Sequence, residues 1–304
     1  MEIQHTTSKL GYSSNILPDN RNVFSIRNKT VSMDFRFTSN LDFLAKLIQN
    51  KFDGVGIVDG MEGSGKSELA KQMCLYHDPN FSAKDVFYSY DQFKTWLKTA
   101  KKGQAGLWDE FVMAGMSNEA TSKIQKLLIK NLTMIRKKGL MIVLVIPYFF
   151  MLNKYFAKAR SRYLITCYSK GLKRGYARLY DYETKKLMYT AGLKNWNYNL
   201  KKYPPQLVFR FDSWTDELVD EEEIQRKKDE AIEMLDAEKN ELILTPKEIE
   251  AIAGEYGIPY CSQRDKNLYT SFLKLRKKCR KHLKILQEIK KKEMSVEMDL
   301  LQES

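Results

Sequence analysis

Gly60-Met61-Glu62-Gly63-Ser64-Gly65-Lys66-Ser67 is the stretch that decides the fold of this 304-residue chain. It matches the pattern G-x-x-x-x-G-K-S/T, with an apolar run before it at residues 54–59 and a helix-forming stretch after it at residues 66–77. The three glycines let the backbone surround phosphate oxygens with N–H groups, and the following helix adds positive potential. A glycine-rich turn that fits by chance is the competing interpretation, which the flanking strand and helix disfavour.

Each polar residue of this first motif has an expected role. Lys66 is predicted to reach the β- and γ-phosphates of a bound nucleotide, and Ser67 is predicted to ligate Mg²⁺. ATP and Mg²⁺ are therefore the expected ligands. The residues expected to contact the nucleotide are Gly60, Gly63, Ser64, Gly65, Lys66, Ser67 and Glu68.

A second motif, Gly106-Leu107-Trp108-Asp109-Glu110-Phe111, ends an apolar run in two acids. Asp109 is predicted to hold Mg²⁺, directly or through water, and Glu110 to activate the attacking water. Two acids at a strand end also fit a solvated turn. Their position about forty residues after the first motif, on the third strand of a parallel sheet, favours the chemical role. Glu110 and Lys66 are thus expected catalytic residues.

Apolar runs alternate with amphipathic stretches through the middle of the chain. Such runs fit strands covered on both faces, and their alternation with helices implies right-handed crossovers in a parallel sheet. The expected fold class is α/β, a P-loop NTPase with a central, mostly parallel sheet of about five strands. The strands are expected at residues 54–59, 85–90, 105–111, 140–146 and 163–169, and the helices at residues 41–51, 66–77, 91–101, 117–138 and 150–157.

The pattern changes after residue 171. Residues 175–181 and 186–190 alternate like two strands, which predicts a β-hairpin extension of the sheet. A Pro-Pro pair at 204–205 punctuates the chain, and residues 217–241 are charged and helical. The expected organisation is a loose polar N-terminal arm with a short strand near residues 35–37 (1–38), an ATPase core with the hairpin extension (39–205), a charged helical linker (206–244) and a small basic helical C-terminal unit (245–304).

The order of these elements, with both motifs in place, resembles the ASCE division of P-loop ATPases. Within it, the chain resembles the FtsK–HerA-like motors and the zonula occludens toxin-like ATPases of filamentous viruses, over about residues 50–170. Two features depart from that pattern. The toxin-like branch typically carries a membrane-spanning segment after the ATPase core, and this sequence has none. The family also implies a polar sensor after the fourth strand, where Tyr148 is the nearest candidate.

Arg160 and Arg162 lie just before the fifth expected strand. The resemblance to ring motors implies an arginine near this point that reaches a neighbouring subunit's γ-phosphate and stabilises transition-state charge. A basic surface turn or a contact to DNA is the alternative. The same resemblance implies a homo-oligomeric ring, because an arginine that acts in trans needs a neighbour.

The chain is strongly basic, with a formal net charge of +13. Residues 264–292 hold twelve basic side chains against two acids, Asp265 and Glu288, which gives a local net charge of +10. Apolar residues recur through this stretch, so an amphipathic basic helix is expected. It favours DNA as a partner, gripped through phosphates rather than read through bases. A solvated helix face and an anionic membrane surface are the alternatives.

Nothing in the sequence directs the chain out of the cytosol. The four cysteines are scattered, so neither a zinc site nor a redox motif is expected. The first residues lack the basic start and apolar run of a secretory signal. The longest apolar stretch, 140–152, contains Pro147 and is too short to span a bilayer, so no integral membrane segment is expected. The expected location is the cytoplasm, and for a viral protein that of the host cell.

These observations predict an ATP-hydrolysing motor that acts on nucleic acid, in viral or mobile-element DNA packaging, transfer or replication. An AAA-like helicase loader or another DNA-binding switch ATPase is the first alternative. A small-molecule kinase is the second, and Glu110 argues against it because transfer to a substrate hydroxyl needs no water-activating base there. A membrane-tethered assembly ATPase is a further alternative, disfavoured because the sequence has no spanning segment.

Overall fold

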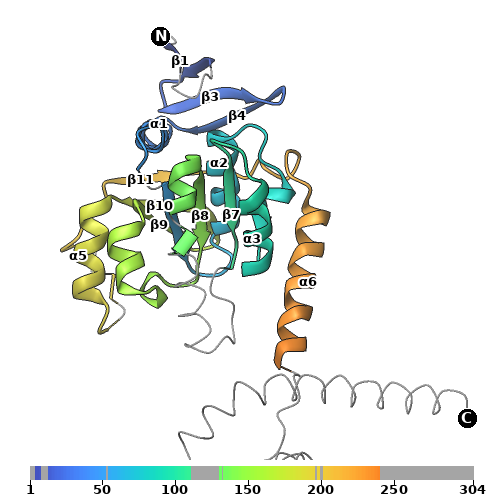
Figure 1. The fold of residues 1–304 in the computed structure, drawn as a ribbon. Coiled ribbons are helices and arrows are strands. Elements are labelled where there is room, and N and C mark those ends of the chain that lie inside the picture. Colours follow the sequence, from blue (N-terminus) through green and yellow to red (C-terminus); the bar gives the residue numbers. More distant parts are fainter. Residues whose placement is uncertain are drawn as a thin grey trace, which may run out of the picture. The chain divides into compact units, whose positions relative to one another are not determined.

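The chain divides into two units, and most of the described residues belong to the first. The computed structural model in Figure 1 describes residues 4–7, 13–52, 54–110, 130–131, 133–195, 197–198 and 201–239. The first unit is Met1–Ala231 and the second is Ile232–Ser304. Helix α6 (Glu221–Lys239) begins in the first unit.

A mixed sheet of seven strands forms the centre of the first unit, as far as the chain is described. The strand order is β11-β10-β9-β5-β8-β7-β6. The five strands from β9 to β6 run parallel, which confirms the expected parallel core. Every residue of β6, β7 and β8 is buried, as the continuous apolar runs predict. The parallel strands are β5 (Gly54–Gly60), β6 (Val86–Phe87), β7 (Ala105–Trp108), β8 (Met141–Val145) and β9 (Tyr163–Lys170).

Strand β8 lies between β5 and β7, although β7 precedes it in the chain. Neighbouring strands are about 4.8 Å apart, so the carboxyl ends of β5 and β7 are separated by roughly 10 Å. Both strands run in the same direction, and the loops that follow them therefore leave the same edge of the sheet. This topology brings the two sequence motifs within reach of each other.

Helices cover both faces of the sheet (Figure 1). On one face, α1 (Phe35–Gln49) and α2 (Lys66–His77) share a core with Val58 of β5. On the other, α3 (Tyr90–Thr99) and α5 (Tyr182–Gly192) share a second core with Ile57, the preceding residue. The alternation of β5 side chains between two cores is the physical reason for its unbroken apolar sequence. Short helical turns complete the connections: η1 (Ala83–Asp85), η2 (Phe149–Met151) and η3 (Phe156–Arg160).

Two antiparallel strands, β10 (Lys173–Tyr180) and β11 (Leu207–Arg210), extend the sheet beyond β9. The expected extension exists, but its hairpin is formed by β9 and β10. The expected end of the core at residue 205 is wrong, because β11 follows it and pairs with β10. Phe209 of β11 stacks on Phe37 of α1 at 4.3 Å between ring centroids, which fixes the added strand to the core.

The second strand of the expected hairpin, at residues 186–190, is instead part of helix α5. Asp181 caps this helix, since its side chain accepts a hydrogen bond from Thr184 N at 2.8 Å. Lys185, Met188 and Tyr189 are buried, at the spacing of one helix face. The apparent alternation at residues 186–190 therefore comes from helical spacing, seen over too few residues to distinguish it from a strand.

The expected loose arm at the N-terminus is wrong for the residues that lead into α1. A four-stranded antiparallel sheet occupies this region, and its last two strands bury Phe24 and Val31. Phe24 packs edge-on against Tyr76 of α2, 5.2 Å between centroids, so this sheet belongs to the core. Asp34 then caps α1, where a short strand was expected. The strands are β1 (Gln4–Thr7), β2 (Ser13–Ile16), β3 (Arg21–Ile26) and β4 (Lys29–Asp34).

Two expected elements lie largely or wholly outside the described residues. Of the long helix predicted at 117–138, only residues 130–131 and 133–138 are described, and they are helical. The predicted basic unit at 245–304, including the stretch 264–292, is not among the described residues. Within the described ranges, no helix combines the length and apolar character needed to cross a bilayer.

Lys185 provides a test of this fold. It is buried, donates to Ala157 O at 2.7 Å, and burial lowers its pKa to about 7. In the unfolded chain this lysine keeps its proton to about pH 10.4, so the unfolded state binds more protons between pH 7 and 10 and stability rises with pH. We expect this lysine to contribute a rise of about 1.4 kcal/mol per pH unit in the free energy of unfolding.

The variant Lys185→Met should lose that contribution, as measured by urea unfolding at pH 7.5 and 9.5. Lys186→Met, which changes the half-exposed neighbour, is the matched control and should retain it. An equal pH dependence in the two variants would show that Lys185 is not buried as described.

Candidate active site

The loop between β5 and α2 has a backbone that its glycines make possible. Gly60, Gly63 and Gly65 all have positive φ angles, of 133°, 71° and 95°. At Gly60 a Cβ atom would lie 2.1 Å from the backbone oxygen of Cys167, so no larger residue fits. Gly65 is the left-handed N-cap of α2, and the ring of Phe211 lies 3.1 Å from where its Cβ would be. The glycines of the motif are therefore required by backbone geometry and by close contacts.

The start of α2 offers backbone donors. Its N-cap, Gly65, has no side chain to satisfy the first N–H groups of the helix. Ser64 is buried and its hydroxyl donates to Met61 O at 2.7 Å, which braces the loop internally. Uncapped N–H groups at the positive end of a helix dipole attract anions.

Lys66 adds a cation to this loop. Its Nζ donates to Gly60 O at 2.9 Å and to Met61 O at 3.0 Å, and it forms no ion pair within the described part of the chain. These hydrogen bonds go to neutral carbonyls, so the ammonium group has no direct ionic partner there, although its charge also acts on the buried Asp59 carboxyl. The ammonium group is therefore free to exchange these carbonyls for an anion.

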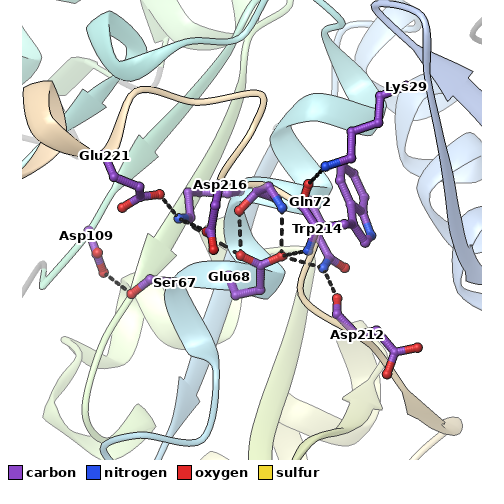
Figure 2. A network of polar contacts seen from close by, with 11 residues as sticks. Lys29, Ser67, Glu68, Gln72, Asp109, Asp212, Trp214, Asp216 and Glu221 are labelled. Atoms are coloured by element: carbon purple, nitrogen blue, oxygen red, sulfur yellow. Dashed lines mark hydrogen bonds and ion pairs between the residues drawn. The ribbon is translucent and has the colours of Figure 1, made fainter.

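A hydrogen bond between Ser67 and Asp109 joins the two motifs (Figure 2). Ser67 Oγ donates to Asp109 Oδ1 at 3.1 Å, and Glu110 N donates to the same oxygen at 3.0 Å. Asp109 is buried, and burial raises the pKa of its carboxyl while the Ser67 hydroxyl lowers it. The pair places a hydroxyl and a carboxylate, both hard oxygen donors, at one point of the sheet edge.

Glu110 contacts a lysine of α6. Its Oε1 lies 2.6 Å from Lys228 Nζ, and this hydrogen bond raises the pKa of Lys228. The backbone of Glu110 is left-handed, with φ of 49°, which is uncommon for a residue with a side chain. Both side chains are partly exposed, so the ion pair adds little stability. Its consequence is that the carboxylate is already engaged.

Asp59, which the sequence interpretation missed, holds together the strands at this edge. It is fully buried, directly before Gly60, and accepts hydrogen bonds from Thr166 Oγ1 at 2.7 Å, Tyr198 Oη at 2.5 Å and Phe149 N at 3.1 Å. Burial raises the pKa of this carboxyl to about 6. An acid inside an otherwise apolar strand was the available signal.

Glu68, an expected nucleotide contact, has a carboxylate that faces a different segment (Figure 2). Its Oε1 accepts from Trp214 N at 2.9 Å and Thr215 N at 3.2 Å, and Gln72 Nε2 donates to the same oxygen at 2.7 Å. The Thr215 hydroxyl donates to Oε2. Lys71, one turn further along α2, forms an ion pair with Glu221 at the start of α6. The first two turns of α2 therefore anchor the chain that follows β11.

A cavity of about 450 Å³ opens beside the loop. The motif forms one wall, and β10 with the chain after β11 forms the other. Its lining residues are Gly63, Gly65, Lys66, Ser67, Glu68, Arg174, Gly175, Phe211, Asp212 and Ser213.

Arg160 and Arg162 lie at the opposite edge of the sheet. Arg162 N donates to Val55 O at 2.7 Å, at the start of β5, and its guanidinium lies 5.1 Å from the ring centroid of Phe52. About 16 Å of strand separates Val55 from Gly60. Arg160 ends η3 just before this point. Neither arginine is brought to the loop of its own chain.

Tyr148, the expected sensor, follows β8 at the edge where the motifs meet. Its side chain is 48% exposed. Its position therefore agrees with the expected place after the fourth parallel strand, while the buried hydrogen bonds at that point are made by the next residue, Phe149, through its backbone N–H.

Comparison with known proteins adds little. No protein-family model matches the chain, and no curated protein matches its sequence. Among solved structures, the cytoplasmic domain of the type VII secretion ATPase EccC of Thermomonospora curvata is similar at a TM-score of 0.30 and 11% identity. The match covers 53% of this chain and 25% of that chain, so this chain spans about a quarter of the length of that structure. At this score the likeness is too low to interpret the site.

The anchoring role of Glu68 can be tested by substitution. Glu68→Ala leaves three donors of residues 214 and 215 without their acceptor, while Gln72 Nε2 keeps its bond to Asp212 O, so we expect a loss of about 3 kcal/mol in the free energy of unfolding. Hydrogen exchange at the amides of Trp214 and Thr215 should also become faster. Glu62→Ala, in the exposed part of the loop, is the control and should change neither quantity. Unchanged exchange at residues 214 and 215 would contradict the anchoring role.

Proposed function

We propose that this chain binds ATP at the loop of residues 60–67 and hydrolyses it at the edge of the sheet where Asp109 and Glu110 lie. The contact between Ser67 and Asp109 is the observation that carries the proposal. It joins a loop suited to phosphate with an acid suited to a metal ion. Lys66, which precedes Ser67, adds a cation that forms no ion pair in the described part of the chain. Glu68, in this proposal, contributes its backbone at the start of α2.

Mg²⁺ fits the oxygen donors that meet at this point. It prefers oxygen ligands and usually keeps several water or phosphate oxygens in its shell, so two protein ligands suffice. Ser67 and Asp109 would hold it, since their oxygens already meet at 3.1 Å at this edge of the sheet. When bound, Mg²⁺ supplies charge neutralisation to the phosphates.

Glu110 is the proposed base for the attacking water. In the structure Oε1 of its carboxylate is bound to Lys228, so this oxygen can accept a proton from water only after the contact breaks. The left-handed backbone conformation at Glu110 sets the direction of its Cα–Cβ bond. Hydrolysis is therefore expected to depend on the position of α6.

Nucleic acid is the proposed partner, and a DNA motor of the FtsK–HerA-like or toxin-like kind is the proposed biological class. The net charge of +13 and the basic stretch 264–292 support an anionic polymer. Arg160 and Arg162 lie away from their own loop, so a role for either in hydrolysis requires a neighbouring copy, as in a homo-oligomeric ring.

Steady-state ATP hydrolysis with and without single- and double-stranded DNA tests this function. We expect DNA to stimulate the wild type, and Glu110→Gln to lower the rate about 10²-fold or more. Glu222→Gln, at an exposed position outside the proposed site, is the control and should keep the wild-type rate.

The other outcomes separate the alternatives. ATP binding without hydrolysis under any DNA condition would contradict the motor and favour a switch ATPase. Phosphate transfer to an added acceptor would favour a kinase.

The ion pair between Glu110 and Lys228 leads to a separate prediction. Because Lys228 engages the proposed base, Lys228→Ala should raise the hydrolysis rate measured without DNA by several-fold. Arg226→Ala, which removes an ion pair within the same helix, is the matched control and should leave the rate unchanged. A fall in rate comparable with that of Glu110→Gln would instead show that Lys228 positions the base.

A further inference from the structure

A cation outside both motifs faces the loop. Arg174, on β10, lies against Gly63: a Cβ atom built on Gly63 would be 3.8 Å from Arg174 Cζ and 3.9 Å from Nη2. Arg174 also lines the cavity that Lys66 and Ser67 line. Two cationic side chains, one from the motif and one from a distant strand, thus border the same space.

The strand pairing explains how Arg174 reaches this position. β9 runs parallel to β5 with Cys167 beside Gly60, so β9 ends on the side of the loop. β10 returns antiparallel from the same side, and its register shifts between Lys173 and Tyr176. A bulge of this kind redirects the side chains next to it. Arg174 is one of those side chains.

Contacts to Phe211 hold this bulge in place. Gly175 has φ of 84°, and a Cβ atom there would lie 2.3 Å from Phe211 O. Phe211 N donates to Gly175 O at 2.8 Å, and the Phe211 ring packs against Gly65 in the loop. Phe211 therefore contacts both the bulge and the loop, and this shared contact holds Arg174 next to the loop.

Arg174 has no competing partner in the part of the chain that the structure describes. Its guanidinium makes no hydrogen bond, ion pair or ring contact there. Neighbouring arginines on the same sheet are engaged: Arg178 lies 3.7 Å from the ring centroid of Tyr168, and Arg210 pairs with Asp212 at 3.4 Å.

The two acids that line the cavity are directed to other partners. Asp212 pairs with Arg210, and the Glu68 carboxylate accepts from the amides of residues 214 and 215. The cavity therefore presents the charges of Lys66 and Arg174, which suits a multiply charged anion.

We propose that Arg174 binds the phosphates of a nucleotide held in the loop of the same chain. A guanidinium group matches phosphate oxygens with paired N–H donors, which a lysine does not. This inference rests on the proposed function. It differs from the arginine in trans expected from Arg160 or Arg162, because it needs no neighbouring subunit.

Equilibrium binding of ATP and ADP in the presence of Mg²⁺, measured by titration calorimetry on the full chain, tests the proposal. Arg174→Ala should weaken ATP binding about 10- to 100-fold, and Arg174→Lys should restore part of the loss. Lys173→Ala, at the exposed preceding position, is the matched control and should bind ATP as the wild type does. Thermal unfolding of each variant reports whether it is folded.

The outcomes distinguish this inference from the function on which it rests. Wild-type affinity in a folded Arg174→Ala, with binding lost in Lys66→Ala, would overturn the role of Arg174 and leave nucleotide binding intact. No binding of ATP by the wild type would overturn both. An effect of Arg174→Ala that appears only at concentrations where the chain oligomerises would overturn action within one chain.

Discussion

The hydrogen bond from Ser67 to Asp109 connects parts of the chain that meet only because of the strand order. Placing β8 between β5 and β7 leaves a gap of one strand between the two motifs, and side chains from both sides close it. Parallel strands end at a common edge, so residues from separate loops converge there. Asp59 stabilises that edge, since it accepts hydrogen bonds from Thr166 of β9 and from Phe149 in the chain after β8. The glycine loop, the proposed metal-binding pair and the proposed base all depend on this alignment.

The chain that follows β11 connects the same edge to α6. Glu68 holds Trp214 and Thr215, and α6 begins a few residues later. Lys228 of α6 then returns to Glu110. One end of this segment thus contacts Glu68, the neighbour of Ser67, and the other end contacts Glu110, the neighbour of Asp109. A change in either contact would alter how the start of α6 is held, which couples the proposed site to this helix.

The sequence predicted the parallel strands and both motifs because each depends on local patterns: apolar runs, glycines and a terminal acid pair. It failed where the pattern was short or the partner distant. Residues 186–190 looked like a strand because five residues are too few to distinguish the two-residue period of a strand from the 3.6-residue period of a helix. The N-cap at Asp181, which lies outside that stretch, begins a helix. The N-terminal strands were missed because polar residues alternate with their buried ones, and one of the buried residues, Asn22, is itself polar. Lys228 and Arg174 reach the site only through tertiary packing, so no local signal could mark them.

The central claim is that Ser67 and Asp109 form a site for a metal-bound nucleotide. Its most direct test is titration calorimetry of ATP into the wild-type chain, first without and then with Mg²⁺. We expect binding of one ATP per chain that becomes several-fold tighter when Mg²⁺ is present, because both oxygen donors then engage the metal. Absence of ATP binding in both conditions would contradict it.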